Sequence, residues 1–126
     1  MYTQYNGGNM KTITILKWAS FENLPDFKKL CQKHLWTLKE VTMNYNPSDG
    51  LPFRESIENW PFRAVFEENG ELIEVRIFSL TVGYRGAGPK DFISILDYLG
   101  VSYDENDIYT KRRMGPDGFI RLHYVL

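Results

Sequence analysis

The chain has 126 residues, of which 43% are hydrophobic, 15% aromatic and 25% charged, and this composition predicts one folded domain and excludes a disordered chain. Fifteen Lys and Arg residues nearly balance sixteen Asp and Glu residues, so the overall charge argues against a nucleic-acid partner. The single cysteine cannot form an intramolecular disulfide, and no apolar stretch approaches the roughly 18 residues that span a bilayer. These features predict a cytoplasmic protein that is not embedded in a membrane.

The first nine residues, "MYTQYNGGN", lack the basic and apolar regions of a secretion signal. A strand-like segment begins directly after them, at Met10. We therefore interpret residues 1–9 as a flexible N-terminal extension or an upstream alternative start. Residues 10–126 are expected to form a single domain.

The first half of this domain changes its hydrophobic period twice. The segment "KTITILKW" (residues 11–18) alternates and is rich in β-branched residues, which predicts a strand. Apolar residues three and four positions apart then predict a helix over about 24–35, with Asn23 as its N-cap. Strand chemistry returns in residues 37–45, and a loop rich in turn-forming residues follows.

The clearest local signal is a β-hairpin. Asn69-Gly70 lies between two apolar runs, and a tight type I′ turn needs positive φ at both central positions. The apolar residues of the second arm change parity after Ile77. This change predicts a β-bulge or twist near residues 77–79, or burial of both faces of the strand.

The second half contains one helical stripe. It predicts a helix over about 89–99 that ends at Gly100. The polar segment 102–118 is expected to be turn-rich with a short strand at 108–111, and residues 119–126 form a closing strand. The predicted fold is α+β: a mainly antiparallel sheet of about five strands with two helices on one face, in the order β-α-β-β-β-α-β.

The segment "LTVGYRGAGPKDF" (residues 80–92) departs from both common phosphate-binding loops. Pro89 displaces Lys90 by one position from the Walker pattern, and Asp91 stands where a hydroxyl is needed. Asp91 also occupies the place of the third glycine in the dinucleotide fingerprint. We interpret the segment as a tight strand-to-helix connection, with Gly88 or Ala87 at the N-cap and Pro89 at the first helical position.

A binding function remains open for this loop, because Arg85 and Lys90 flank a helix N-terminus that attracts anions. "KRRMGPDG" (residues 111–118) is a second basic turn. If the two turns are adjacent, Lys111, Arg112 and Arg113 would extend one patch able to contact an acidic partner or phosphates. The acids of "YDENDIY", just upstream, favour the alternative of a self-neutralised, solvated loop.

Catalytic and metal motifs are missing from the sequence. His34 and His123 have no cysteine or second histidine at ligand spacing, and the acids of residues 104–107 lack the glycine and distal glutamate of a calcium loop. There is no nucleophile elbow. We therefore expect a protein that is not an enzyme and that uses no metal or cofactor.

The stretch "GYRGAGP" (residues 83–89), followed by an amphipathic helix, resembles a G-Y-x-G-x-G-P pattern in small uncharacterised proteins of phages and other bacterial mobile elements. The resemblance covers about 20 of the 126 residues. It implies an accessory or anti-defence protein, a class that includes inhibitors of CRISPR nucleases. Such proteins act by binding, without a cofactor or chemistry.

Two functions are therefore compared. The first is a small binding protein, monomeric or homodimeric, that inhibits a larger host protein such as a defence nuclease; the alternative is a nucleotide or phosphorylated-metabolite module that uses residues 83–90. Nucleic-acid binding ranks third, since it needs the two basic turns to cluster. Aromatic and arginine residues dominate protein interfaces. The candidate binding residues are Tyr45, Trp60, Tyr84, Arg85, Lys90, Tyr109, Lys111, Arg112 and Arg113.

Overall fold

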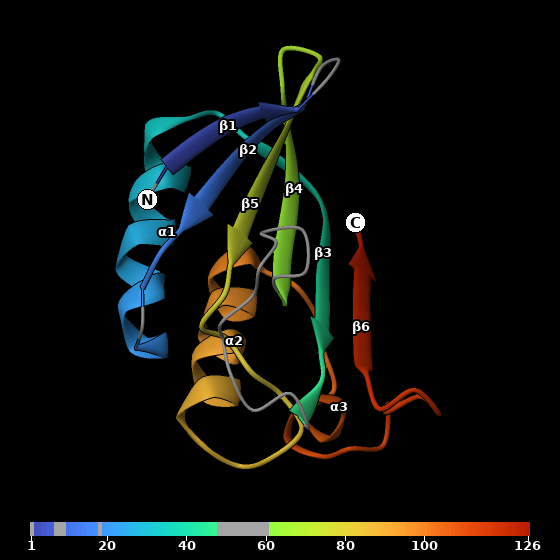
Figure 1. Ribbon diagram of the computed structural model, residues 1–126. Helices are drawn as coiled ribbons and strands as arrows, with labels where there is room; N and C mark the ends of the chain where they lie inside the picture. Colours follow the sequence, from blue (N-terminus) through green and yellow to red (C-terminus); the bar gives the residue numbers. More distant parts are fainter. Residues whose placement is uncertain (1, 7–9, 18, 48–60) are drawn as a thin grey trace.

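The computed structural model describes residues 2–6, 10–17, 19–47 and 61–126, with side chains from residue 10 onward (Figure 1). The predicted α+β fold is confirmed: a mainly antiparallel sheet packs against two longer helices. The elements in chain order are β1 (Tyr2–Asn6), β2 (Met10–Ile15), the 3-10 turn η1 (Ser20–Glu22), α1 (Asn23–Lys33), β3 (Thr37–Tyr45), β4 (Phe62–Glu68), β5 (Glu71–Ile77), α2 (Ala87–Leu99), α3 (Glu105–Tyr109) and β6 (Ile120–Val125).

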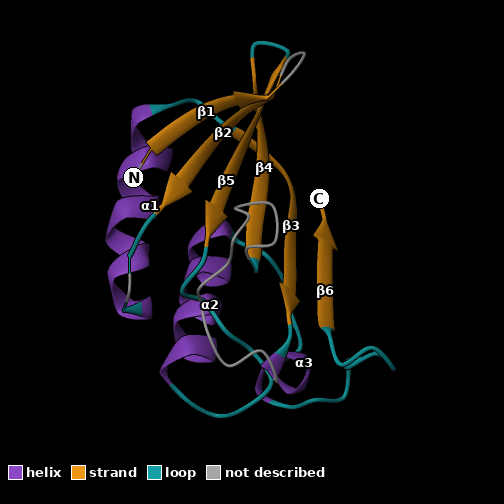
Figure 2. Ribbon diagram, in the orientation of Figure 1, coloured by secondary structure: helices purple, strands orange, loops and turns teal. Residues whose placement is uncertain are grey.

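The strands form one six-stranded sheet in the order β1-β2-β5-β4-β3-β6 (Figure 2). Among the described strands, only β2 and β5 pair in parallel. Since β3 is antiparallel to β4 and β4 to β5, β3 runs in the direction of β2, and α1 crosses over between them. Helices α1 and α2 contact each other on one face of the sheet, and β1 and β6 are its two edge strands.

Phenylalanines hold the helices to this face. Phe27 of α1 packs edge-on against Phe62 of β4, with ring centroids 6.0 Å apart, and Phe62 packs in the same way against Phe92 of α2. Phe66 contacts Phe27 from the same strand as Phe62. All four rings are buried, so their hydrophobic burial supplies much of the driving force that joins both helices to the sheet.

Local sequence signals are confirmed where one strong preference acts. The strand predicted at residues 37–45 is β3 to the residue. The Asn69-Gly70 turn joins β4 to β5 with φ of 52° and 80°, and α2 ends at Gly100 in the left-handed region. These positions follow from backbone conformations that glycine and asparagine adopt readily.

Several local predictions differ from the structure. Residues 2–6, expected in a flexible extension, form β1 and pair with β2. Asn23 is the first residue of α1 and not its N-cap, because η1 runs directly into the helix; its buried amide donates to Ser79 Oγ at 2.7 Å. The parity change after Ile77 reflects the end of β5, and the bulge lies instead in β3, between Leu38 and Glu40.

Residues 108–111, predicted as a short strand, do not form one. Residues 105–109 form the short helix α3, and the Asp104 side chain caps it by accepting a hydrogen bond from the Asn106 amide at 2.9 Å. Acidic residues favour the first turn of a helix because its free amides and dipole are positive. The acids of "YDENDIY" therefore start a helix where a solvated turn was predicted.

Candidate functional site

The glycine-rich loop after β5 is attached to α3. The Gly83 amide donates to the Ile108 carbonyl at 2.8 Å, and Gly83 has φ of 98°. A Cβ atom at this position would lie 2.6 Å from Ile120 Cδ1. Only glycine combines a positive φ with so little space for a side chain. The hydrogen bond to Ile108 places the turn of residues 83–90 next to the turn of residues 111–118.

The Tyr84 side chain packs against the glycines of this loop, where a phosphate-binding loop would contact its ligand. Its hydroxyl is 2.8 Å from the Thr81 hydroxyl, and a Cβ atom on Gly86 would come within 2.5 Å of its ring. A Cβ atom on Gly88 would collide with the Thr81 hydroxyl. These two glycines therefore allow close side-chain packing over the start of α2.

The start of α2 also differs from the prediction. Gly86 is the N-cap, so Pro89 is the third helical residue and not the first. Proline is still tolerated there because the amides of the first turn have no partner within the helix. Asp91, the residue that departs from both phosphate motifs, accepts a hydrogen bond from Ser20 Oγ at 2.5 Å and so joins α2 to η1.

Arg85 brings the loop and α3 into one surface. Its guanidinium lies 4.8 Å from the centre of the Tyr109 ring, a cation–π contact at the end of α3. Lys111 lies near Gly83, because a Cβ atom there would be 3.8 Å from its Cγ atom. We call this region the α3 surface. It comprises Tyr84, Arg85, Tyr109, Lys111, Arg112 and Arg113.

The other predicted binding residues lie elsewhere. Lys90 is exposed on α2, and no ion pair or ring contact among the described residues joins it to the α3 surface. Tyr45 packs against the hydrophobic core. Trp60 falls outside the residues that the structure describes.

Acidic residues neutralise two of the cations of the α3 surface. Arg112 donates to Asp104 at 2.7 Å and to Asp107 at 2.6 Å, and Arg113 donates to Asp107 at 2.9 Å. Burial of Asp107 tends to raise its pKa, but the hydrogen bonds from both arginines outweigh burial and lower it. The sequence had suggested that Arg85, Lys90 and the three cations of residues 111–113 could form one patch, and the structure does not form it. The alternative prediction, a loop whose charges neutralise each other, holds for Arg112 and Arg113.

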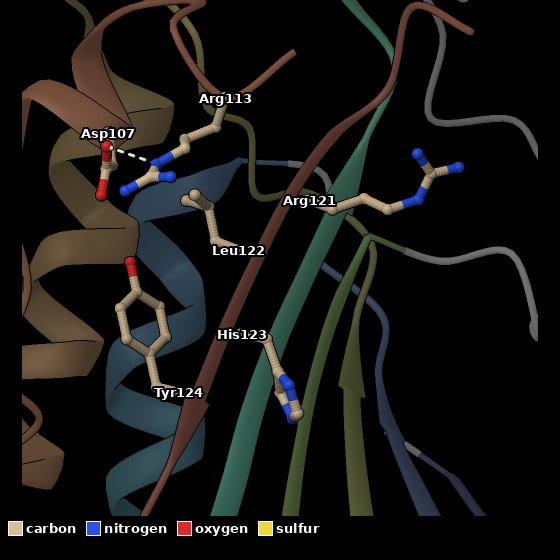
Figure 3. A pocket seen from close by; sticks show the side chains of 6 residues that line it. All are labelled: Asp107, Arg113, Arg121, Leu122, His123 and Tyr124. Atoms are coloured by element: carbon tan, nitrogen blue, oxygen red, sulfur yellow. Dashed lines mark hydrogen bonds and ion pairs between the residues drawn. The ribbon is translucent and has the colours of Figure 1, made fainter. Parts of the chain in front are cut away.

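A polar depression of about 290 Å³ adjoins the α3 surface at the β6 edge of the sheet (Figure 3). Figure 3 shows Arg113, Leu122 and Tyr124 on one side of β6, with Arg121 and His123 on the other. The residues that line it are Asp107, Arg113, Arg121, Leu122, His123 and Tyr124.

Tyr124 presents an unpaired polar atom near this depression. Its hydroxyl is buried without a hydrogen-bond partner among the described residues, and in Figure 3 it points toward Asp107. Burial, reinforced by the charge of Asp107, raises the pKa of Tyr124 to about 12. The phenol is therefore protonated at neutral pH and can donate a hydrogen bond.

The sequence interpretation did not identify Tyr124, Arg121 or Asp107 as site residues, and it considered His123 only as a metal ligand, which the spacing argued against. One signal was available in the predicted strand at residues 119–126. Its alternating side chains place residues 121, 123 and 125 on one face and residues 120, 122 and 124 on the other. The strand's position at the sheet edge was not available from that pattern. The depression exists only because β6 pairs with β3 and α3 lies beside it.

A second polar group lies on the sheet face opposite the helices. Glu74, only 1% exposed, pairs with Arg63 and Arg76. Glu40 extends this network to β6, since it lies 3.9 Å from Arg63 and 2.8 Å from His123 Nε2. The Asn69-Gly70 turn predicts that β4 and β5 pair, and in the structure Val65 lies opposite Glu74. The turn gave no indication that the Glu74 carboxylate is buried.

Cys31 and His34, two other side chains with reactive groups, lie in packed surroundings. Burial raises the pKa of the Cys31 thiol to about 11, and His34 stacks on Trp36 with ring centroids 4.6 Å apart. Among the described residues, no cluster of three or more His, Cys, Asp or Glu side chains could hold a metal ion. Of the helices described, none is long and apolar enough to cross a membrane.

No family model matches the chain, and neither a curated protein nor a solved structure shows significant similarity to it.

Proposed function

We propose that this protein is a small, non-enzymatic binding protein that occludes part of a larger host protein through the α3 surface. The observation that carries the proposal is the contact of Arg85 with Tyr109, which joins two sequence-distant turns into one exposed face. Tyrosine and arginine are the residues that most often dominate the energy of protein interfaces. By the resemblance of residues 83–89, a CRISPR nuclease is the first partner class to test.

The α3 surface is pre-organised for such a contact. Tyr84 remains 46% exposed, although its hydroxyl is held by Thr81 and its ring lies against Gly86. An exposed aromatic ring that is already fixed loses little conformational entropy on binding. The paired arginines around Asp107 keep hydrogen-bond donors available without adding a strong net charge.

The alternative, a nucleotide or phosphorylated-metabolite module, has weaker support. Tyr84 lies against the glycines that would have to approach a phosphate, and Pro89 removes an amide from the first turn of α2. Lys90 is the remaining feature in its favour, as an exposed cation in that turn. A thermal shift with a nucleotide panel tests this alternative directly.

Affinity purification from a bacterial lysate tests the proposal. The wild-type chain is expected to recover one stoichiometric protein partner, and Arg85→Glu is expected to lose it by charge reversal at the centre of the surface. Lys29→Glu is the matched control, because Lys29 is exposed on α1, away from the α3 surface. Recovery of no stoichiometric partner, or equal loss with both variants, contradicts the proposal.

A further inference from the structure

The outer edge of β6 has main-chain groups that no strand in the described part of the chain pairs with. Successive residues of a strand direct their amides and carbonyls to opposite edges. The Leu126 amide donates to the Lys39 carbonyl of the β3 segment at 3.1 Å, so even-numbered residues face β3. His123 and Val125 therefore direct their amides and carbonyls away from the sheet, and no other strand of the described chain lies beyond β6 (Figure 1).

The lower end of this edge is closed by the chain itself. The Gly115 amide donates to the Phe119 carbonyl at 2.8 Å, and Met114 forms an isolated antiparallel bridge with Ile120. The open part therefore begins above Ile120, at the level of the polar depression. It is short, which limits an added strand to a few residues.

The depression beside this edge is small. At about 290 Å³ it lies at or below the lower end of small-molecule pockets, which run from about 300 Å³ upward. Arg113 uses its Nε to contact Asp107, and its terminal nitrogens make no hydrogen bond with a described residue. These nitrogens and the unpaired Tyr124 hydroxyl are donors on the same side of β6.

We propose that the free edge of β6 binds an extended segment of a partner protein by strand addition, with an aspartate or glutamate of that segment contacting Arg113 and Tyr124. Strand addition takes its affinity from main-chain hydrogen bonds and its specificity from alternate side chains. Of the two arginines in the lining, Arg121 lies on the other side of β6 and pairs with Asp117, so the terminal nitrogens of Arg113 are the donors that favour an acidic residue. This inference rests on the proposed function and names the chemistry of the partner.

A second copy of the chain fits this edge less well. A symmetric pairing would place β6 against β6, and the sequence of β6, "IRLHYV", contains no carboxylate side chain. Its Arg121 would instead bring a further cation to an edge that already carries cations. A second β6 strand would therefore bring no side-chain carboxylate to the terminal nitrogens of Arg113 or to the Tyr124 hydroxyl.

Selection of random peptides of about twelve residues on the immobilised full chain provides the probe. Peptides with an acidic residue in a β-forming sequence are expected, and Tyr124→Phe should weaken the selected peptides by about tenfold. His123→Pro removes one outward amide while leaving the β3 ladder intact, because that amide faces away from β3. It should abolish binding, whereas the matched control His123→Ala, which keeps the amide, should retain it.

Equal binding by His123→Pro and His123→Ala would overturn strand addition, as would selected peptides without an acidic preference. A wild-type dimer in light scattering that His123→Pro converts to a monomer would assign the edge to a second copy and also overturn the proposal. If the lysate partner depends on Arg85 but is insensitive to His123→Pro, the proposed function stands and this inference fails. If no lysate partner exists, the peptide selection still decides the role of the edge.

Discussion

The two basic turns, residues 83–90 and 111–118, have similar compositions but are stabilised by different interactions. The first is held by main-chain and aromatic packing: Gly83 bonds to Ile108, and Tyr84 lies against Gly86. The second has main-chain hydrogen bonds as well, but among the described residues it adds ion pairs that the first lacks, of which Arg113 with Asp107 is one. Glycine-rich basic segments therefore need not share a role. An added side-chain atom should disrupt the first turn, whereas loss of a charge or a change of pH should disrupt the second.

The largest effect is expected from Gly88→Ala in the first turn. The new methyl group would collide with the Thr81 hydroxyl, so the free energy of unfolding should fall by about 2 kcal/mol in urea denaturation. Gly115→Ala in the second turn is the matched control. Its methyl group would lie 3.2 Å from Asp117 Oδ1 and at ordinary contact distance from Arg121 and Phe119, so it should cost less than about 1 kcal/mol.

Removing Thr81 Oγ should separate a collision from other causes. In the Gly88→Ala background, Thr81→Ala is expected to restore part of the lost stability, and the double-mutant cycle measures the coupling. Equal losses in Gly88→Ala and Gly115→Ala would contradict the packing account of the first turn.

A smaller, pH-dependent effect is expected from Asp107→Asn in the second turn. At pH 7 the variant should lose about 1 kcal/mol, discounted for the exposure of Arg113, because both arginine contacts weaken. The folded state lowers the pKa of Asp107, so its contribution is complete above the unfolded value of about 4 and disappears as the pH falls through the folded value.

Urea denaturation at a series of pH values measures this dependence. The stability difference between wild type and Asp107→Asn should therefore shrink below about pH 4. Asp117→Asn, which removes a more exposed pair with Arg121, should show a smaller difference at neutral pH. A constant difference across the acid range would exclude the ion pairs as its source.

The smallest effect is expected from Tyr84→Phe. The variant loses the hydrogen bond to Thr81 but keeps the ring against Gly86, so it should lose about 0.5 kcal/mol of stability. Thr81→Val in a double-mutant cycle isolates this bond, and additive losses would show that the two hydroxyls do not interact. Because the ring stays in place, partner recovery in the lysate experiment should be nearly unchanged.

The hydrophobic period predicted the main elements of the fold well. β3, the Asn69-Gly70 turn and the end of α2 at Gly100 depend on interactions within a few residues, so the local sequence contains the required information. The error at Asn23 arose where a neighbouring element decides a boundary, as η1 does for α1. The error at residues 108–111 was a local one, because the capping signal of Asp104 was not recognised.

The candidate site was predicted only in part. The sequence alone indicated the basic residues of the two turns and excluded the phosphate-loop interpretations, because Pro89 and Asp91 occupy definite motif positions. Their pairing with acids was also suggested by the charges just upstream. The roles of Tyr124 and Arg113 could not be predicted, since they follow from the placement of α3 beside the edge of the sheet.

The amino-acid sequence by itself therefore determined the α+β class, the two longer helices and most strands, because periodicity and turn chemistry act over short distances. The tertiary structure alone decided that β6 is an edge strand and that Gly83 bonds to Ile108, contacts whose partners lie far apart in the chain. Strand pairing and burial set these contacts, and they create both the α3 surface and the polar depression beside it.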